Sequence, residues 1–159
     1  MAKTRTVAGA GTLGAALLVL IFGSQPVAEW VDRHTSSGSA WGWFMRVLTW
    51  PRWAVGPDDN TSAAMRKLLS QDLRALLLIL FVALILAFAA KGVTGGGPAF
   101  ILGWAALIFA AALAAFATAF ILASPTLRNA LEVAAAAAGF GLFAGWLVGI
   151  ITATGKAAG

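Results

Sequence analysis

The sequence predicts an all-α integral membrane protein with about four transmembrane helices and a Trp-rich interfacial amphipathic helix between the first and the second. Hydrophobic residues make up 60% of the 159 residues and charged residues only 11%, whereas a soluble domain is about 45–50% apolar and about 25% charged. The apolar residues also gather into runs about as long as a bilayer requires, roughly 20 residues each. No alternating pattern typical of a strand accompanies them.

Composition also limits the chemistry and the partners. The chain has no cysteine, which excludes disulfides, thiolate metal sites and cysteine nucleophiles. Its formal net charge of +5 comes from 11 basic and 6 acidic residues. A small basic excess in so apolar a chain is typical of membrane topology signals and of contact with anionic lipid headgroups. We therefore expect the lipid bilayer and its anionic headgroups as a partner, and no nucleic acid.

Residues 1–23 are predicted as a basic head followed by the first transmembrane helix. The head reads MAKTRT, and residues 7–23 carry no charge. A cleaved secretory signal peptide is the alternative, but a cut after Ala28 would put Pro26 where a small residue is required, so we favour a retained span. Small residues recur four apart in the pairs Ala10–Gly14 and Gly11–Ala15. Such pairs favour close contact with another helix.

Residues 24–71 are predicted as a Trp-rich polar and interfacial loop with an amphipathic helix at 40–50. Pro51 ends that helix, because proline disfavours helix in the residue before it. One side of the helix is expected to carry Trp43, Val47 and Trp50, and the other Arg46 and Thr49. Tryptophan beside arginine is typical of a helix that lies in the headgroup layer. The residues expected at this interface are Trp41, Trp43, Trp50, Trp53, Arg46 and Arg52.

Residues 72–159 are predicted as a three-helix membrane region with spans at about 75–90, 99–123 and 129–154. We expect Thr61 to cap the long helix that leads into the first of these spans. The turn at 124–129 is so short that the last two spans are expected to form an antiparallel hairpin.

Small residues recur at every fourth position of the last span. They are Ala137, Gly141, Gly145, Gly149 and Ala153. Residues i and i+4 lie on one face of a helix, so this pattern, a glycine zipper, predicts a smooth face for close helix packing. Its expected counterpart on the preceding span is the face that carries Ala106, Ala110 and Ala114 and leads to Thr118.

Few residues offer chemistry. Glu132 is either a proton or cation site or, as we favour, a first-turn acid stabilised by the helix dipole and by Arg128. His34 lacks further ligands at metal-site spacing. Interface anchoring explains Trp104 and Trp146 better than a quinone or pigment site does. We therefore predict no enzyme, no cofactor and no metal site.

The small-residue faces favour a non-catalytic structural or assembly subunit of a larger bacterial membrane complex, built with itself or with other membrane subunits. The alternative is a homo-oligomeric pore, either holin-like or a secretion or export channel subunit, although few polar residues are available to line it. The hairpin over 98–155 resembles pilin-type subunits of conjugative secretion systems, and the short basic head resembles that of holins. The first two spans and the Trp-rich loop have no counterpart in the pilin pattern.

Four spans place both termini on one side of a cell membrane. Lys and Arg near the spans are almost level on the two sides. The first helix usually dominates and its head is basic, so we expect both termini in the cytoplasm. The cluster of Arg66, Lys67 and Arg74 favours the opposite orientation.

Overall fold

The computed structural model describes residues 2–36, 38–56, 59–122 and 126–158, without the side chains of residues 2–6, 122 and 158. Their regular secondary structure is helical, with one isolated parallel bridge between Ser24 and Trp53 and no strand among the described residues. The elements are α1 (Ala2–Phe22), α2 (Gln25–His34), α3 (Ala40–Leu48), α4 (Ser62–Ala89), the 3-10 turn η1 (Ala90–Gly92), α5 (Gly96–Leu122) and α6 (Leu127–Ala158). The all-α prediction is therefore confirmed for the part of the chain that the structure describes.

Three helical stretches are long and apolar enough to cross a membrane, as the sequence predicts. They are Ser62–Gly92, Gly96–Ile121 and Leu127–Ala157. The first helix contributes a shorter apolar stretch, Val7–Phe22. The predicted third span ends at residue 123, which lies outside the described residues together with the start of the predicted turn.

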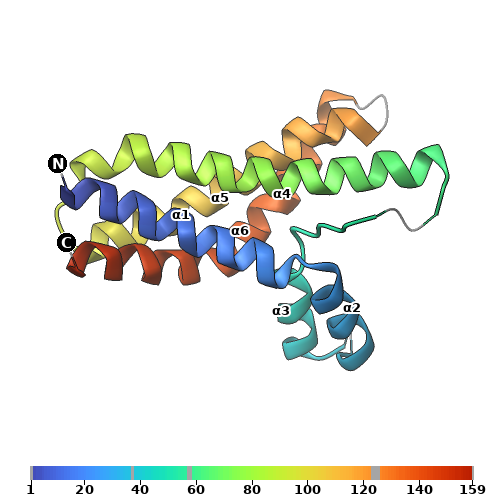
Figure 1. The fold of residues 1–159 in the computed structure, drawn as a ribbon, viewed down its shortest axis with the longest axis horizontal. Coiled ribbons are helices and arrows are strands. Elements are labelled where there is room, and N and C mark those ends of the chain that lie inside the picture. The colour runs from blue at the N-terminus through green and yellow to red at the C-terminus, as the bar shows by residue number, and fades with distance from the viewer. Residues whose placement is uncertain (1, 37, 57–58, 123–125, 159) are drawn as a thin grey trace.

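The long helices form an elongated bundle (Figure 1). Helices α5 and α6 share the most extensive interface, α4 lies along α5, and α1 contacts both α4 and α6. Both chain ends lie at one end of the bundle, near the connection from α4 to α5. Helices α2 and α3 branch off beyond the end of α1, while the start of α4 and the tip of the α5–α6 hairpin extend further.

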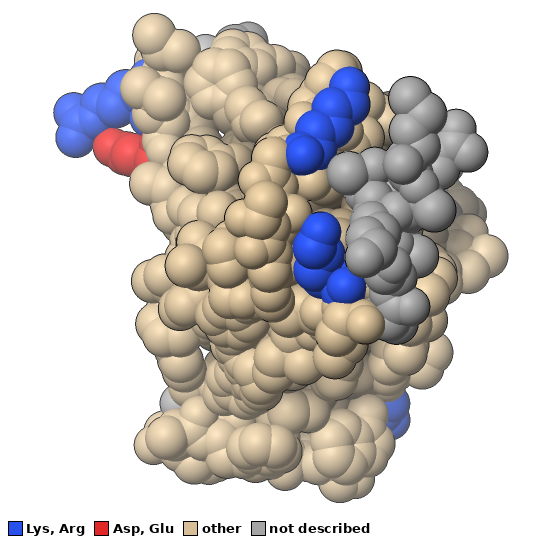
Figure 2. Space-filling view, turned by 90° about the vertical axis from the view of Figure 1, so that its left-hand side faces the viewer, with Lys and Arg blue, Asp and Glu red and all other residues tan. Residues whose placement is uncertain are grey.

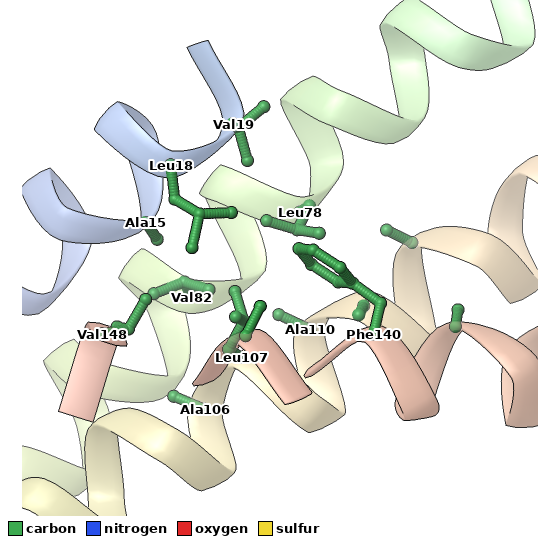
Figure 3. Close-up of a cluster of buried hydrophobic side chains, with 14 of the residues drawn as sticks. Ala15, Leu18, Val19, Leu78, Val82, Ala106, Leu107, Ala110, Phe140 and Val148 are labelled. Atoms are coloured by element: carbon green, nitrogen blue, oxygen red, sulfur yellow. The ribbon is translucent and has the colours of Figure 1, made fainter. Parts of the chain in front are cut away.

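Apolar side chains from the four long helices meet in one core (Figure 3). Leu78 and Val82 of α4, Leu107 of α5 and Val148 of α6 are fully buried there, beside Leu18 of α1. Lipid tails are as apolar as these side chains, so burial alone does little to hold such helices together inside a bilayer. Close approach of the backbones must therefore contribute much of the packing.

The glycine face of α6 makes such an approach to α5. A Cβ atom on Gly141 would lie 2.7 Å from the backbone nitrogen of Ile108, and one on Gly149 would lie 2.8 Å from the carbonyl oxygen of Phe100. A Cβ atom on Gly145 would lie 3.0 Å from the carbonyl oxygen of Trp104. These glycines are therefore occupied by contacts within one chain.

The neighbours of this glycine face on α5 differ from the predicted ones. The atoms nearest to its glycines belong to Phe100, Trp104, Leu107 and Ile108, whereas the expected counterpart was the alanine face that begins at Ala106. The indole nitrogen of Trp104 donates to the carbonyl oxygen of Leu142 at 2.9 Å, which helps to set this register. The predicted alanine face is fully buried as well, and its last residue, Thr118, accepts a hydrogen bond from α4. The buried residues of that face are Ala106, Ala110, Ala114 and Thr118.

Helix α1 joins the bundle through the same kind of contact. Cβ atoms on Gly11 and on Gly103 of α5 would both collide with the side chain of Thr152, at 2.6 Å from its Oγ1 and 2.8 Å from its Cβ respectively. A Cβ atom on Gly14 would lie 2.8 Å from Cδ1 of Ile151. The small residues of α1 are therefore also used inside the chain.

Two features of the segment between α1 and α4 differ from prediction. Helix α2 was not expected; it begins with Pro26 in its first turn and buries only Ala28 and Val31. Helix α3 ends at Leu48, two residues earlier than predicted, because Thr49 forms its C-cap. Proline is favourable in a first helical turn, where its missing N–H would have no partner in any case.

Candidate functional site

Helices α2 and α3 and the following residues 49–54 form a unit, here called the annex, that is fixed to the bundle. The backbone nitrogen of Trp53 donates to Gly23 O at 2.9 Å, and its indole nitrogen donates to Val19 O at 3.2 Å, so Trp53 closes the end of α1. The backbone nitrogen of Ala54 donates to the carboxylate of Asp72 in α4 at 3.1 Å. The annex is thus attached to two long helices at one level of the bundle.

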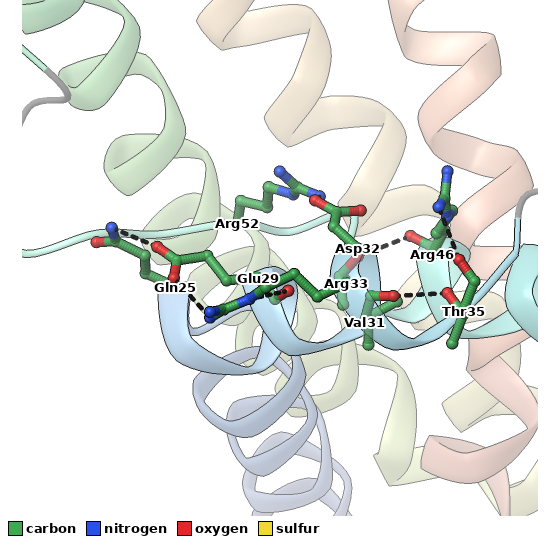
Figure 4. A network of polar contacts seen from close by, with 9 residues as sticks. Gln25, Glu29, Val31, Asp32, Arg33, Thr35, Arg46 and Arg52 are labelled. Atoms are coloured by element: carbon green, nitrogen blue, oxygen red, sulfur yellow. Dashed lines mark hydrogen bonds and ion pairs between the residues drawn. The ribbon is translucent and has the colours of Figure 1, made fainter.

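Polar contacts hold the parts of the annex together (Figure 4). Arg52 pairs with Asp32 at 2.8 Å and links the segment after α3 to α2. Arg46 donates to the carbonyl oxygen of Thr35 at 3.1 Å and links α3 to the end of α2. Exposed ion pairs contribute only about 0–1 kcal/mol each. We infer that these contacts orient the annex more than they stabilise it.

A groove of about 520 Å³ lies between the annex and α6. Its annex side carries two tryptophans and two arginines, and its α6 side carries small residues and two phenylalanines. The lining comprises Trp43, Arg46, Val47, Thr49, Trp50, Arg52, Ala136, Gly139, Phe140 and Phe143. We call this feature the aromatic–arginine groove.

Two aromatic pairs connect the walls of the groove. Trp43 meets Phe143 edge to face, with ring centroids 4.8 Å apart, and Trp50 stacks on Phe140 at 5.1 Å. The guanidinium carbon of Arg74 lies 5.4 Å from the centre of the Trp50 ring, while its Nε donates to the Thr118 hydroxyl at 3.2 Å. Cation–π contacts of this kind contribute about 0.5–2 kcal/mol. Side chains from α3, α4, α5 and α6 therefore meet at the level of the annex.

The arginines of the groove retain unused donors. The Nε atom of Arg46 is buried and has no hydrogen-bond partner. Within the described residues no carboxylate pairs with Arg46 or Arg74, and the one carboxylate paired with Arg52 is that of Asp32. Buried polar atoms nearly always have a partner, so the free Nε of Arg46 is a distinctive feature of this groove.

The structure brings some of the predicted interfacial residues together and separates others. Trp43, Trp50, Arg46 and Arg52 line the groove. Trp41 is 65% exposed and contacts Phe44, at a ring distance of 6.2 Å. Trp53 does not line the groove; it lies against α1 and α4.

The predicted division of the two sides of α3 is wrong for Arg46 and Thr49. Both line the groove together with Trp43 and Trp50. The hydroxyl of Thr49, the C-cap of α3, donates to Arg46 O at 3.0 Å, and the residue is buried. Phe140, Phe143 and Arg74 were not predicted at this site. Nothing in a run of alanine and glycine indicates which side of α6 faces the annex, and the spacing of α4 does not show that Arg74 meets Trp50.

The other polar residues considered from the sequence have simple surroundings. Glu132 pairs with Arg128 at 2.9 Å on the exposed side of α6. The His34 ring stacks on Trp30 with centroids 5.0 Å apart. Hydrogen bonds from the Thr61 hydroxyl and backbone nitrogen lower the pKa of Asp59, which lies before α4. Among the described residues no three histidine, aspartate or glutamate side chains gather as metal ligands would.

Comparisons with protein-family models, with curated proteins and with solved structures find no match for this chain.

Proposed function

We propose that this chain is a multi-pass subunit of the cell membrane with a structural or assembly role and no catalysis of its own. The observation that carries the proposal is the annex, a unit hydrogen-bonded to α1 and α4 that presents large aromatic side chains outside the bundle. Trp41 is 65% exposed and Trp30 is 50% exposed. Exposed aromatic clusters rimmed by polar residues are typical of contact surfaces.

We place the membrane boundary at the level of the annex. From Arg74 to Lys91, α4 and η1 rise about 25 Å, and Val7–Phe22 of α1 rises about 22 Å, at about 1.5 Å per residue. A hydrocarbon layer is about 30 Å thick, and bilayers adjust to somewhat shorter helices at modest cost. This supports α1 as a fourth span, with tryptophan and arginine of the annex in the headgroup layer.

The surroundings of the threonines support a subunit over a pore. The hydroxyl of Thr152 donates to Val148 O at 2.7 Å, and that of Thr118 donates to Ala114 O at 2.9 Å. Both residues are fully buried within one chain. A water-filled path would need polar groups directed into a shared lumen.

The test is purification in mild detergent, with measurement of the particle mass and of co-purifying chains. We expect a defined set of partner chains that is lost in Trp41→Ala and kept in Trp146→Ala, a matched tryptophan variant outside the annex. A homo-oligomeric ring that conducts ions would favour the pore instead. A monomer without partners in the wild-type chain would contradict both functions.

A further inference from the structure

We propose that the aromatic–arginine groove binds the phosphate headgroup of an anionic membrane lipid, with the acyl chains along Phe143 of α6, a residue that is 43% exposed. The proposal rests on the membrane placement given above, because a lipid reaches the groove only if the annex lies at headgroup level. It goes beyond general contact with lipid by assigning one site with defined ligands for the phosphate.

The charged side of the groove suits a phosphate. Arg46 uses one terminal nitrogen for Thr35 O and leaves its buried Nε without an acceptor. A phosphate oxygen in the groove supplies that acceptor once the guanidinium turns toward it. Arg52 pairs with Asp32 through a single nitrogen and keeps other donors. Arginine forks match phosphate oxygens in geometry and in charge.

The carboxylates around the groove leave it positive. Asp32 is the carboxylate that approaches a groove arginine, and its charge is already matched by Arg52. Arg74, behind the Trp50 ring, has a hydroxyl and an aromatic ring as partners and no carboxylate among the described residues. An anion in the groove would therefore meet Arg46, which has no carboxylate partner among the described residues, and Arg52, whose one carboxylate partner is Asp32.

The apolar side of the groove suits an amphiphile. Its floor is made of Ala136 and Gly139, and a Cβ atom on Gly139 would meet nothing within 4 Å. Its volume of about 520 Å³ falls within the range of about 300–1,000 Å³ typical of ligand pockets. Free phosphate would use the arginines and leave the wall of phenylalanine and tryptophan empty. A lipid uses both sides.

The test measures lipid binding to the full chain in mild detergent by native mass spectrometry, with phosphatidylglycerol, phosphatidylcholine and inorganic phosphate as probes. We expect phosphatidylglycerol to bind at least about tenfold more tightly than phosphatidylcholine, as hydrogen bonds between charged groups allow. Arg46→Gln and Gly139→Leu should each weaken phosphatidylglycerol binding about tenfold, the first by loss of charge and the second by filling the hollow. The control is Arg33→Gln, which removes an arginine of the annex that pairs with Glu29 outside the groove.

Three results would overturn the proposal. They are equal affinity for the two lipids, unchanged phosphatidylglycerol binding in both groove variants, and displacement of the lipid by inorganic phosphate at matching concentrations. If Arg46→Gln loses helicity, phosphatidylglycerol binding to Gly139→Leu tests the proposal instead, because residue 139 has room for a side chain and this variant should still fold. Carbonate extraction shows whether the chain stays in the membrane, which the proposed function requires whether or not the groove binds a lipid. A chain that stays in the membrane with its partners but shows no lipid preference would contradict the lipid site alone.

Discussion

Thr152 shows that the role of a polar residue in an apolar chain depends on its neighbours. From the sequence, Thr152 is a candidate for the lining of a pore. In the structure its hydroxyl donates to Val148 O within the same helix, and glycines of α1 and α5 lie against its side chain. A hydroxyl that is satisfied inside its own helix costs little in an apolar environment, so threonine acts here as a compact packing residue.

Enlarging this side chain should separate three helices. We expect Thr152→Leu to lower the free energy of unfolding by about 1–3 kcal/mol, because the extra volume meets Gly11 and Gly103. Thr152→Val keeps the shape and should change stability much less. Thermal unfolding in mild detergent, followed by circular dichroism, checks both variants. Equal melting temperatures for the leucine and valine variants would show that this contact is absent.

Asp59 provides a test at the start of α4. Its carboxylate accepts hydrogen bonds from the Thr61 hydroxyl and from Thr61 N, the latter at 2.8 Å, and these bonds lower its pKa from the ordinary value of 3.8. A lowered folded pKa means that the contribution is complete above the unfolded pKa and is lost as the pH falls through the folded pKa. Carboxyl chemical shifts against pH should show this lowered pKa in the wild type and a higher one in Thr61→Val. An identical titration in the two proteins would contradict this assignment.

At the scale of elements, α6 offers two nearby glycines with opposite surroundings. Gly141→Ala should destabilise the hairpin by about 1–3 kcal/mol, because the new methyl group meets the backbone of Ile108. Gly139→Ala is the matched control; its methyl group meets nothing within 4 Å, and alanine is the better helix former by roughly 1 kcal/mol. Melting temperatures in detergent should therefore move in opposite directions. A shift of the same sign and size in both variants would mean that α6 does not pack on α5 through this face.

The elements themselves could be predicted from the sequence much better than their contacts could. Long apolar runs require helices in a bilayer, because each backbone group must find its partner within the segment. Helix α2 has no such signal, since its sequence is polar and it buries only two residues. The register of α5 on α6 depends on Trp104, whose bond to Leu142 O could not be read from spacing. The annex side of the groove could be predicted, because tryptophan beside arginine indicates an interface. The α6 side could not, because the direction in which Phe140 and Phe143 point depends on how α6 packs in the folded hairpin.

At the scale of the whole molecule, the two ends of the bundle differ in charge. The acidic residues that the structure describes lie toward the annex and the hairpin tip; they are Glu29, Asp32, Asp59, Asp72 and Glu132. Figure 2 shows the opposite end, where basic side chains lie on a surface with little other charge. Lys91 in η1 and Lys156 in the last turn of α6 belong to this end. The first span usually dominates the orientation, so the basic head before α1 favours the cytoplasmic side for this end.

This asymmetry leads to a topology prediction that the absence of cysteine makes simple to test. In intact cells a membrane-impermeant maleimide should label Ser36→Cys in the annex and should label Gly97→Cys, at the start of α5, only after permeabilisation. If α1 crosses the membrane, the N-terminus lies on the same side as Gly97. An N-terminal tag should then be protected from external protease in intact cells. Leu80→Cys, midway along α4 and facing outward, should resist labelling in membranes because its thiol lies in hydrocarbon. A tag on the same side as Ser36→Cys would leave three spans, and labelling of Ser36→Cys only after permeabilisation would reverse the orientation.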